Sequence, residues 1–416
     1  MIPLPLDDEE MTALLADMRR GPYLLQPSVQ LLNLDHEILS DLSERVLDGQ
    51  VDCSLSGTTT TRSLTVTLAD PTREVPLDGA DAADGALFYD KMIRAGVRIK
   101  GPRLGRWVTI PLFCGPLTNA SRTGWTAQVT AQGKERLATG QVWDPTTYPA
   151  GSRKTDTIAD LLVATGETRR RLHVPDLRAR QPKDLTLRRT DTTWPSVSQL
   201  ATSLNRQAMY DGRGDFRLRR WPDDPRARFR DGNGGTILTD PVVTYDEYSG
   251  WNGVLVRGPL KRTGRTIQVA RWLPRQHQLS PWARRRGGVP FRRAYVVTEN
   301  SLRSRAEAVE IADRYMRRLV RETVKVTVDV MPHWLLEPGD VYAITTTAVG
   351  YLEQQITEMS IPLTGGTPMS LGATKRLRRP GQPVTGRTGT TRVRTATSHT
   401  PGTTALTPAR NRGLPR

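Results

Sequence analysis

The side chains of this chain that could carry catalytic or metal chemistry are few and widely spaced. No two of its histidines stand in an HExxH or HxH pattern, or at any spacing that sets two ligands on one face of a helix or strand. Cys53 and Cys114 lack CxxC or Cys/His spacing, so each is expected to be a small buried side chain, with a single disulfide between them as the alternative. The sequence therefore predicts no metal site at its five histidines, His36, His173, His277, His333 and His399.

Motifs for nucleophilic and phosphate chemistry are also missing from the sequence. It has no GxSxG elbow, no GxxxxGK[ST] loop and no GxGxxG after a strand, and the glycine-containing runs 57–61 and 232–235 lack the lysine and helix start that cradle phosphate. The acidic neighbours Asp223–Asp224 and Asp246–Glu247 would point apart on a strand, so we interpret them as solvated loop charges. We predict no catalytic residue, no cofactor-binding residue and no cofactor, and hence a protein that is not an enzyme.

One tripeptide, Arg213-Gly214-Asp215, is known from receptor adhesion. It lies within the segment 209–218, where an Asp-Gly turn between short apolar runs predicts a β-hairpin. Because such a turn needs these residue types in any case, we interpret the tripeptide as a turn and not as an adhesion site.

The elements that would position any site are clearest between residues 301 and 346. A helix is predicted there because apolar residues recur at helical spacing opposite an arginine-rich side. Residues 323–330 follow with valine at every second position, the period of a strand with one dry face. Pro338 and Gly339 then set a turn before a second strand. The apolar stripe of the helix comprises Ala308, Ile311, Ala312, Tyr315, Leu319 and Val320.

The whole chain is predicted to be mainly β with an α+β insert. Short strands with glycine and proline punctuation predict a first antiparallel β-barrel domain at residues 1–150. Helical periodicity at 156–164 and 196–209 predicts a small α+β insert at 151–236, and further strands predict a second β-barrel domain at 237–372. Residues 373–416, rich in Thr, Arg, Pro and Gly, should form a disordered basic tail.

The net charge of +17 over 416 residues raises the question of nucleic-acid binding. Ten of the basic residues and no acidic residue lie from Lys375 to Arg416, which leaves +7 for the rest of the chain. A long loop around Arg284–Arg286 carries another basic run and is predicted to be mobile. The charge therefore favours phosphate binding mainly by this loop and the tail, and only weakly by the body.

No stretch of the sequence has the length of apolar residues that a membrane span needs. The N-terminal region is acidic at residues 7–10, where a signal peptide would be basic. We expect synthesis in a cytoplasm and no membrane anchoring.

The order of these parts resembles the hub, or minor tail, proteins at the tip of long-tailed bacteriophages, a family that includes the baseplate hubs of contractile tails. The resemblance rests on residues 49–54 and 62–68, the pair 97–101 and 110–115, and the helix leading to Pro338-Gly339-Asp340, and it extends to about Leu371. It implies two tail-tube-like barrels, each flanked by a helix, and a homotrimer that makes a ring of six barrels between a sixfold tube and a threefold tip.

The same resemblance implies the partners and the location of the protein. They are distal tail and tape-measure proteins, tail fibre or spike proteins, and phage DNA passing through the lumen during ejection, in a virion assembled in a bacterial cytoplasm. The alternatives from other classes are a nucleic-acid-binding protein that uses the basic loop and tail, and a cell-wall-degrading tail enzyme.

The surfaces that could serve such a hub are few. The strand faces at Thr65–Thr67 and Lys325–Asp329 are candidates for a lumen or a neighbour, with a plain solvated face as the equal alternative. Four tryptophans could anchor partners, although large aromatics more often lie in a core; they are Trp251, Trp272, Trp282 and Trp334.

Overall fold

We describe the fold from a computed structural model of the chain. It describes residues 2–20, 22–71, 87, 90–245, 251–276, 280–282, 290–299, 302–322, 324–347 and 350–375. The predicted Arg284–Arg286 loop, the Asp246–Glu247 pair, His277 and His399 lie outside these residues.

The first half of the structure is an antiparallel β-barrel that begins with a helix, α1 (Asp8–Arg20). The long strand β6 holds the barrel together, since residues 108–116 pair with β5 and residues 117–123 pair with β7. Its strands are β1 (Leu24–Leu32), β2 (Ile38–Asp41), β3 (Val46–Ser56), β4 (Thr59–Ala69), β5 (Met92–Lys100), β6 (Val108–Thr123) and β7 (Thr126–Gln132), with short 3-10 helices η1 (Ser43–Arg45) and η3 (Lys134–Thr139).

The second half repeats this mainly antiparallel construction after residue 224. Its strands are β13 (Pro225–Arg230), β14 (Val242–Tyr245), β18 (Val324–Val330), β19 (Val341–Thr346), β20 (Gly350–Pro362) and β21 (Met369–Lys375). The predicted turn at Pro338 and Gly339 is present, and Gly339 adopts a φ of 85°, a conformation that side chains with a Cβ rarely take. A Cβ there would also lie 2.8 Å from Oε1 of Gln207, so both the backbone and the packing require glycine.

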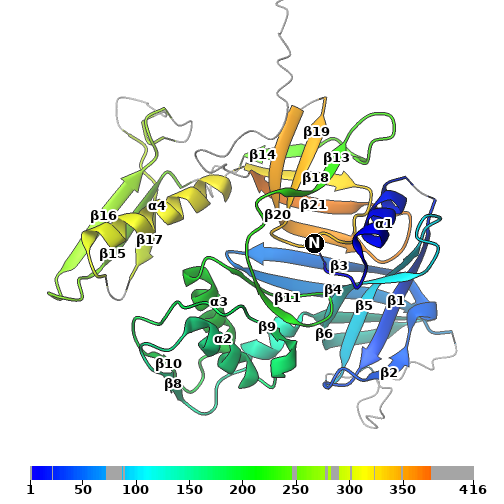
Figure 1. Ribbon diagram of the computed structural model, residues 1–416, viewed down its shortest axis with the longest axis horizontal. Coiled ribbons are helices and arrows are strands. Elements are labelled where there is room, and N and C mark those ends of the chain that lie inside the picture. Colours follow the sequence, from blue (N-terminus) through cyan, green and yellow to red (C-terminus); the bar gives the residue numbers. More distant parts are fainter. Residues whose placement is uncertain are drawn as a thin grey trace, which may run out of the picture. The chain divides into compact units, whose positions relative to one another are not determined.

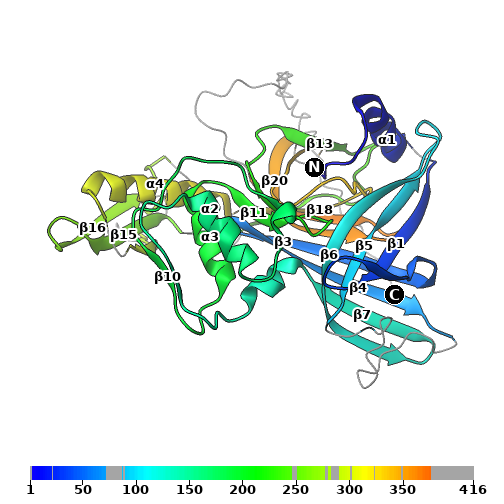
Figure 2. The ribbon, with the colours of Figure 1, turned by 60° about the horizontal axis from the view of Figure 1, so that its bottom comes forward.

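The two halves share one sheet and one core. β20 pairs antiparallel with β3, from Glu358 opposite Ser54 to Pro362 opposite Gln50, and this gives the strand order β14-β18-β21-β20-β3-β4-β7-β6-β5-β1-β2 (Figures 1 and 2). Val66 of the first half and Val328 of the second belong to the same buried apolar cluster. The mainly antiparallel β architecture predicted from sequence is confirmed.

The α+β insert lies between the halves and has its own buried cluster. Helices α2 (Lys154–Val163) and α3 (Thr193–Ser203) pack against the hairpin of β11 (Gln207–Tyr210) and β12 (Phe216–Arg219), with Trp194, Tyr210 and Phe216 in ring contact. Its remaining elements are β8 (Thr146–Tyr148), η4 (Arg169–Arg171), β9 (Leu172–His173) and β10 (Leu185–Leu187). The insert is attached to the first half where Ala208 pairs with Thr59 of β4.

A separate three-stranded sheet lies between β14 and β18 in the chain. It consists of β15 (Gly253–Pro259), β16 (Thr266–Trp272) and β17 (Ala294–Thr298), in the order β16-β15-β17. Helix α4 (Arg305–Glu322) crosses one face of it (Figure 1) and buries Ala308 and Ala312 there. Both residues belong to the predicted stripe, whereas the side chains of Leu319 and Val320 lie outside the described part.

Sequence reasoning misplaced two boundaries and did not locate one helix. The insert begins before residue 151, since β8 pairs with β10. The resemblance implied a helix beside each barrel, but no pattern located α1, because its acidic start was considered only as a contrast to a signal peptide; its apolar side, with Leu14 fully buried, packs on the main core. β21 continues to Lys375, into the predicted tail, because its pairing with β20 and β18 supplies the backbone hydrogen bonds. The predicted tail beyond Lys375 lies outside the described residues.

No helix among the described residues is long and apolar enough to cross a membrane.

Candidate functional site

The histidines and cysteines that were considered for catalytic or metal chemistry do not form a site in the described structure. His173 is partly exposed near Asp215, His333 is buried in the second half, and His36 lies between β1 and β2 with its Nδ1 3.7 Å from Sγ of Cys114. Within the described ranges no three or more His, Cys, Asp or Glu residues are grouped so as to hold a metal ion.

Cys53 and Cys114 are both buried free thiols. Burial raises the pKa of each to about 11, so both remain protonated at neutral pH and neither is an activated nucleophile. The expectation of two small buried side chains is confirmed. The two cysteines are not joined by a disulfide, which was the alternative.

The Arg213-Gly214-Asp215 tripeptide forms the turn of the β11–β12 hairpin, as predicted. Asp211 holds the turn by accepting hydrogen bonds from the backbone N–H groups of Arg213 and Asp215, and the Asp215 carboxylate pairs with Arg171 at 2.8 Å. Residues of the tripeptide therefore make hydrogen bonds and an ion pair within the chain. The carboxylate of Asp223 lies 3.6 Å from Arg220 on the surface, consistent with a solvated loop charge.

His333 has a buried imidazole whose two ring nitrogens have no hydrogen-bond partner in the described residues. Burial lowers its pKa to about 4, and the charge of Arg19 acts in the same direction. The ring is therefore neutral in the folded chain at pH 7, while an unfolded histidine takes up a proton near pH 6.5.

We expect this difference to make the protein acid-sensitive. Because the unfolded chain binds the proton first, His333 should contribute stability that is complete above about pH 6.5 and is lost toward pH 4, by about 2–3 kcal/mol. Urea unfolding of the wild type and of His333→Leu at pH 7.5 and 4.5 measures this. His333→Leu should lose less unfolding free energy between pH 7.5 and 4.5 than the wild type does. The surface control His173→Gln should lose as much as the wild type. Equal losses in the wild type and His333→Leu would contradict the role of His333.

The most extensive feature of the structure is a continuous polar surface on the sheet that joins the two halves. Strand register places Asp329, Ser370, Ser360, Asp52, Ser63 and Gln132 in one row across six strands. Further rows lie beside it. This surface, the polar face, comprises Asp48, Gln50, Asp52, Ser54, Thr61, Ser63, Thr65, Thr67, Asn119, Ser121, Gln128, Thr130, Gln132, Thr244, Lys325, Thr327, Asp329, Gln355, Glu358, Ser360, Ser370, Gly372 and Thr374, with the exposed Val242 at its β14 edge.

The polar face follows from strict alternation in the strands. In β4 the buried residues Leu64, Val66 and Leu68 alternate with Ser63, Thr65 and Thr67 on the other side. Slipping one strand by one residue would bury this polar set. The two candidate stretches from sequence, Thr65–Thr67 and Lys325–Asp329, lie on this one surface although more than 250 residues separate them.

The charge of the polar face differs from that of the chain as a whole. It carries four carboxylates, one lysine and no arginine, in a chain with 60 lysines and arginines. The lysine, Lys325, is neutralised by Glu358 at 2.6 Å. The face is therefore uncharged to mildly acidic, with hydroxyl and amide groups as its main surface.

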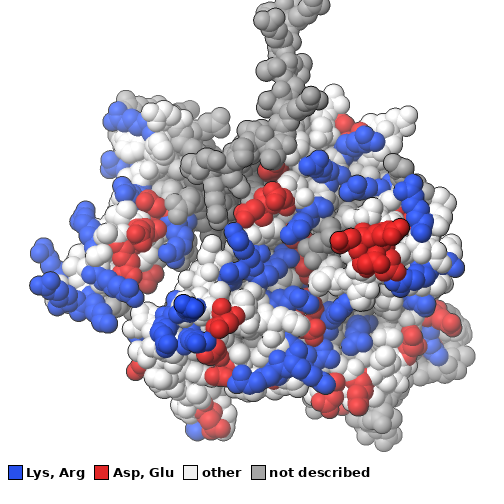
Figure 3. Space-filling model, in the orientation of Figure 1, with Lys and Arg blue, Asp and Glu red and all other residues white. Residues whose placement is uncertain are grey.

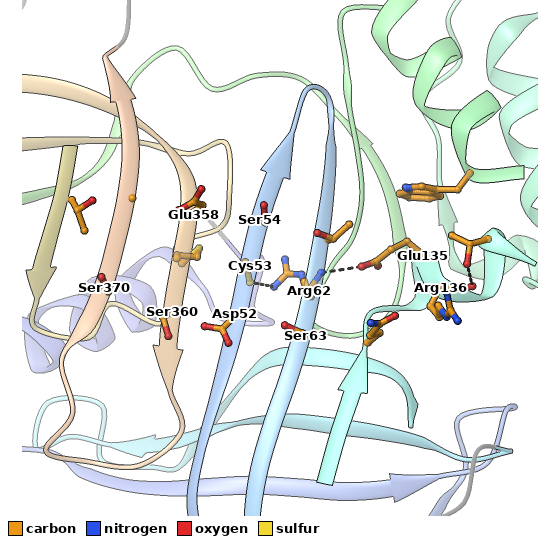
Figure 4. Close-up of a pocket in the computed structure, with 17 residues that line it drawn as sticks. Asp52, Cys53, Ser54, Arg62, Ser63, Glu135, Arg136, Glu358, Ser360 and Ser370 are labelled. Atoms are coloured by element: carbon orange, nitrogen blue, oxygen red, sulfur yellow. Dashed lines mark hydrogen bonds between the residues drawn. The ribbon is translucent and has the colours of Figure 1, made fainter. Parts of the chain in front are cut away.

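An open groove of about 680 Å³ lies on this face where the strands approach the insert (Figure 4). Ser54, Ser63 and Ser360 line it along the strands, and Trp194 of the insert lines its far side. Glu135 of η3 is almost fully buried at the groove, and its Oε1 accepts the backbone N–H of Arg62 at 2.9 Å. Burial raises the pKa of Glu135 to about 7.

A buried polar junction beneath the groove fixes the three parts of the chain to one another. Arg62 of β4 donates to Oε1 of Glu337 at 3.1 Å, and Arg219 of the insert donates to its Oε2 at 3.0 Å. Arg219 also donates to Gln207 and to the carbonyl of Pro338. Glu337 comes from the turn of the second half, so one carboxylate connects all three parts.

The protonation of the junction is fixed by its charges. Burial acts to raise the pKa of Glu337, but Arg219 and Arg62 outweigh it and hold that pKa below its ordinary value. The guanidinium of Arg62 also donates to the carbonyls of Tyr210 and Leu112. Sequence reasoning missed the junction, because 275 residues separate Arg62 from Glu337 and no local pattern marks either residue.

The predicted tryptophan anchors have different positions. Trp334 is core, with its Nε1–H donating to the carbonyl of Pro362, and Trp251 packs beside the α4 cluster. Trp272 and Trp282 are partly exposed. The most exposed tryptophans, Trp125 at 70% and Trp143 at 68%, were not among the predicted ones.

Comparison with known proteins gives a likeness of fold. No protein-family model matches the sequence, and no curated protein sequence matches it. Among solved structures, a tail protein from Neisseria meningitidis MC58 is similar with a TM-score of 0.56 at 11% identity, over 84% of this chain and 97% of that chain. The 43 kDa tail protein of prophage MuSo2 from Shewanella oneidensis has a TM-score of 0.58 at 10% identity, over 84% of this chain and 98% of that chain.

These likenesses extend over nearly the whole of both tail proteins. They confirm the fold that the resemblance to tail-tip hubs implied: a mainly β chain with the architecture of phage tail proteins.

Proposed function

We propose that this chain is a structural hub, or minor tail protein, of a bacteriophage tail tip, and that three copies close into a ring whose lumen is lined by the polar face. The fold shared with two phage tail proteins supports the tail role. The main observation in support of a channel is the polar face, because both halves of the chain contribute strands to it.

Two open strand edges support closure into a ring. The strands that carry the polar face run from β14 to β6; among the described residues β14 pairs with β18 alone, and residues 117–123 of β6 pair with β7 alone. Open edges attract further strands, and a contact between two different edges is head-to-tail, which closes a ring when the rotation fits. Ring closure would cover both edges.

The charge of the face supports passage of DNA. Lysine and arginine bind DNA phosphates without regard to sequence and would hold a moving duplex. The polar face has one lysine, paired with Glu358, and three further carboxylates, so its strands offer DNA phosphates few cations. Arg136 of η3 lines the groove where the strands approach the insert. Outside it, basic and acidic side chains are interspersed on the surface seen in Figure 3, with acidic residues gathered over α1.

The partners follow from this role. The ring would contact distal tail and tape-measure proteins and carry tail fibre or spike proteins, within the virion. In this role the chain would have no catalytic activity. The alternative of nucleic-acid binding through Arg284–Arg286 and the tail rests on residues outside the described part.

The mass of the protein in solution tests the ring. Light scattering of the intact chain at about 0.5 M salt, where nonspecific contacts are screened, should give three times the chain mass of 46.3 kDa. Val242→Asp places a charge on the open β14 edge at a residue that is 62% exposed, and should give monomers. Trp143→Asp, at an exposed residue beside Arg189 of the insert, should leave the trimer intact. A wild-type chain that is monomeric at every concentration would contradict the ring.

A further inference from the structure

Two strands of the three-stranded sheet have sequences suited to burial on both faces. Residues 254–256 read Val-Leu-Val and residues 295–297 read Tyr-Val-Val, with no polar residue between the apolar ones. A sheet with one solvated face shows alternation, whereas continuous apolar runs occur in strands covered on both sides. The pattern therefore favours a cover on each face of these two strands.

The structure supplies one of them. Helix α4 covers the face that carries Val254, Val256, Val269 and Val297, and these side chains form a buried cluster with Ala308 and Ala312 of the helix. Tyr295, on the same side, stacks on Tyr315 of α4 at 5.9 Å between ring centroids.

The opposite face is apolar and partly exposed: Ala270 and Val296 are exposed, whereas Gly253 is buried and the Arg292 guanidinium lies 5.9 Å from the Trp272 ring centroid. The register sets Ala270, Leu255 and Val296 side by side in one row, and Trp272, Gly253 and Ala294 in the next. Val296 is 47% exposed, and none of the six residues belongs to a buried apolar cluster. We call these two rows the apolar rows. Beside them, Gln268, Arg257 and Thr298 make a polar row in which Arg257 donates to Oγ1 of Thr298.

The apolar rows are too small to hold a partner alone. Three strands about 4.8 Å apart and two rows along them cover about 200 Å². A stable interface buries about 800 Å² on each partner. The apolar rows must therefore be one part of a larger interface. The connectivity of the chain indicates which interface that is.

The sheet is inserted at the open edge of the large sheet. The chain enters it after β14 and leaves it through α4 into β18, and Tyr245 and Val324, the ends of those two strands, are paired. Tyr245 and Trp251 are six residues apart, so the first strand of the insertion starts within about 20 Å of the β14 edge. The apolar rows thus belong to the part of the chain that lies next to the proposed ring contact.

We propose that the apolar rows pack against a second copy of this chain, as an extension of the contact made by the β14 edge. This inference rests on the proposed ring and adds a second, apolar attachment to it. The three-stranded sheet then acts as a clamp on the neighbouring copy, and α4 and the neighbour are its two covers.

Photo-cross-linking of the protein with itself tests the clamp. The photoreactive residue p-benzoylphenylalanine replaces Val296 in the full chain, and the matched control carries it at Glu310, an exposed residue of α4 on the covered side. We expect irradiation to join chains covalently at position 296 and not at position 310. Peptide mapping identifies the second site.

The other outcomes separate this inference from the ring. If light scattering gives a trimer but position 296 forms cross-links only within its own chain or none, the clamp is overturned and the ring stands. If the wild type stays monomeric, both are overturned. As an independent readout, Val296→Asp should raise the dissociation constant of the trimer at least tenfold, while Thr298→Asp on the polar row should change it less than threefold; equal effects would overturn the clamp.

Discussion

Replacing Arg62 by methionine should lower the free energy of unfolding by about 3–5 kcal/mol, among the largest losses available from one substitution in this chain. The guanidinium lies fully inside the protein, where it donates to Glu337, Tyr210 and Leu112. Methionine fills part of the space that the arginine occupies. It leaves the carbonyls of Tyr210 and Leu112 without their guanidinium donor, and Glu337 loses one of its two arginine partners. Breaking one side of a buried charge pair costs more than the pair itself contributes.

Denaturant unfolding of the purified protein measures this loss. The matched control is Arg106→Met, since Arg106 pairs with Glu10 at 2.6 Å but at the surface, where such pairs contribute at most about 1 kcal/mol. Arg62→Lys should also be costly, because a lysine cannot reproduce the several directed hydrogen bonds of the guanidinium. If Arg62→Met cost no more than Arg106→Met, the junction would not hold the three parts together.

Placing arginines on the polar face should turn a passive channel into a DNA-binding one. Thr65 and Asn119 lie in one row of the face, separated by Thr130. With both changed to arginine in three copies, the lumen gains six cations. Contacts of that number to phosphate change affinity by about a thousandfold between 50 and 200 mM salt. We expect a short linear duplex to bind the variant at least about 100-fold more tightly than the wild type at low salt.

Fluorescence anisotropy of a labelled duplex across a salt series makes this measurement. Thr12→Arg with Thr147→Arg adds the same charge at exposed positions away from the face and should change binding little. Light scattering of each variant verifies that the ring persists. Equal DNA binding by both double variants would mean that the polar face is not a lumen that DNA can enter.

The parts of the fold that sequence predicted are those fixed by local periodicity. The alternation at 63–68 and 323–330 placed β4 and β18, and apolar spacing at 308–315 placed α4, because each pattern is set by neighbours within a few residues. Gly339 marked its turn for the same reason. The candidate stretches of the polar face were recognised as separate exposed strand faces.

What sequence could not predict depends on pairing across long distances. Nothing local indicates that β20 pairs with β3, and that single pairing merges two polar strand faces into one. The buried junction needs the same tertiary information. Residues 253–298 read as further barrel strands, because a strand sequence does not show which sheet the strand joins. Their short apolar runs were the available signal that a second cover is needed.

The measurement that tests the central claim most directly is an electron cryomicroscopy map of the assembled oligomer. We predict a threefold ring in which the rows through Ser63 and Thr65 face the axis, while α4 and the insert lie outside that lining. A map in which the polar face points away from the axis, or is buried against a neighbouring copy, would contradict the proposal that this face lines a channel.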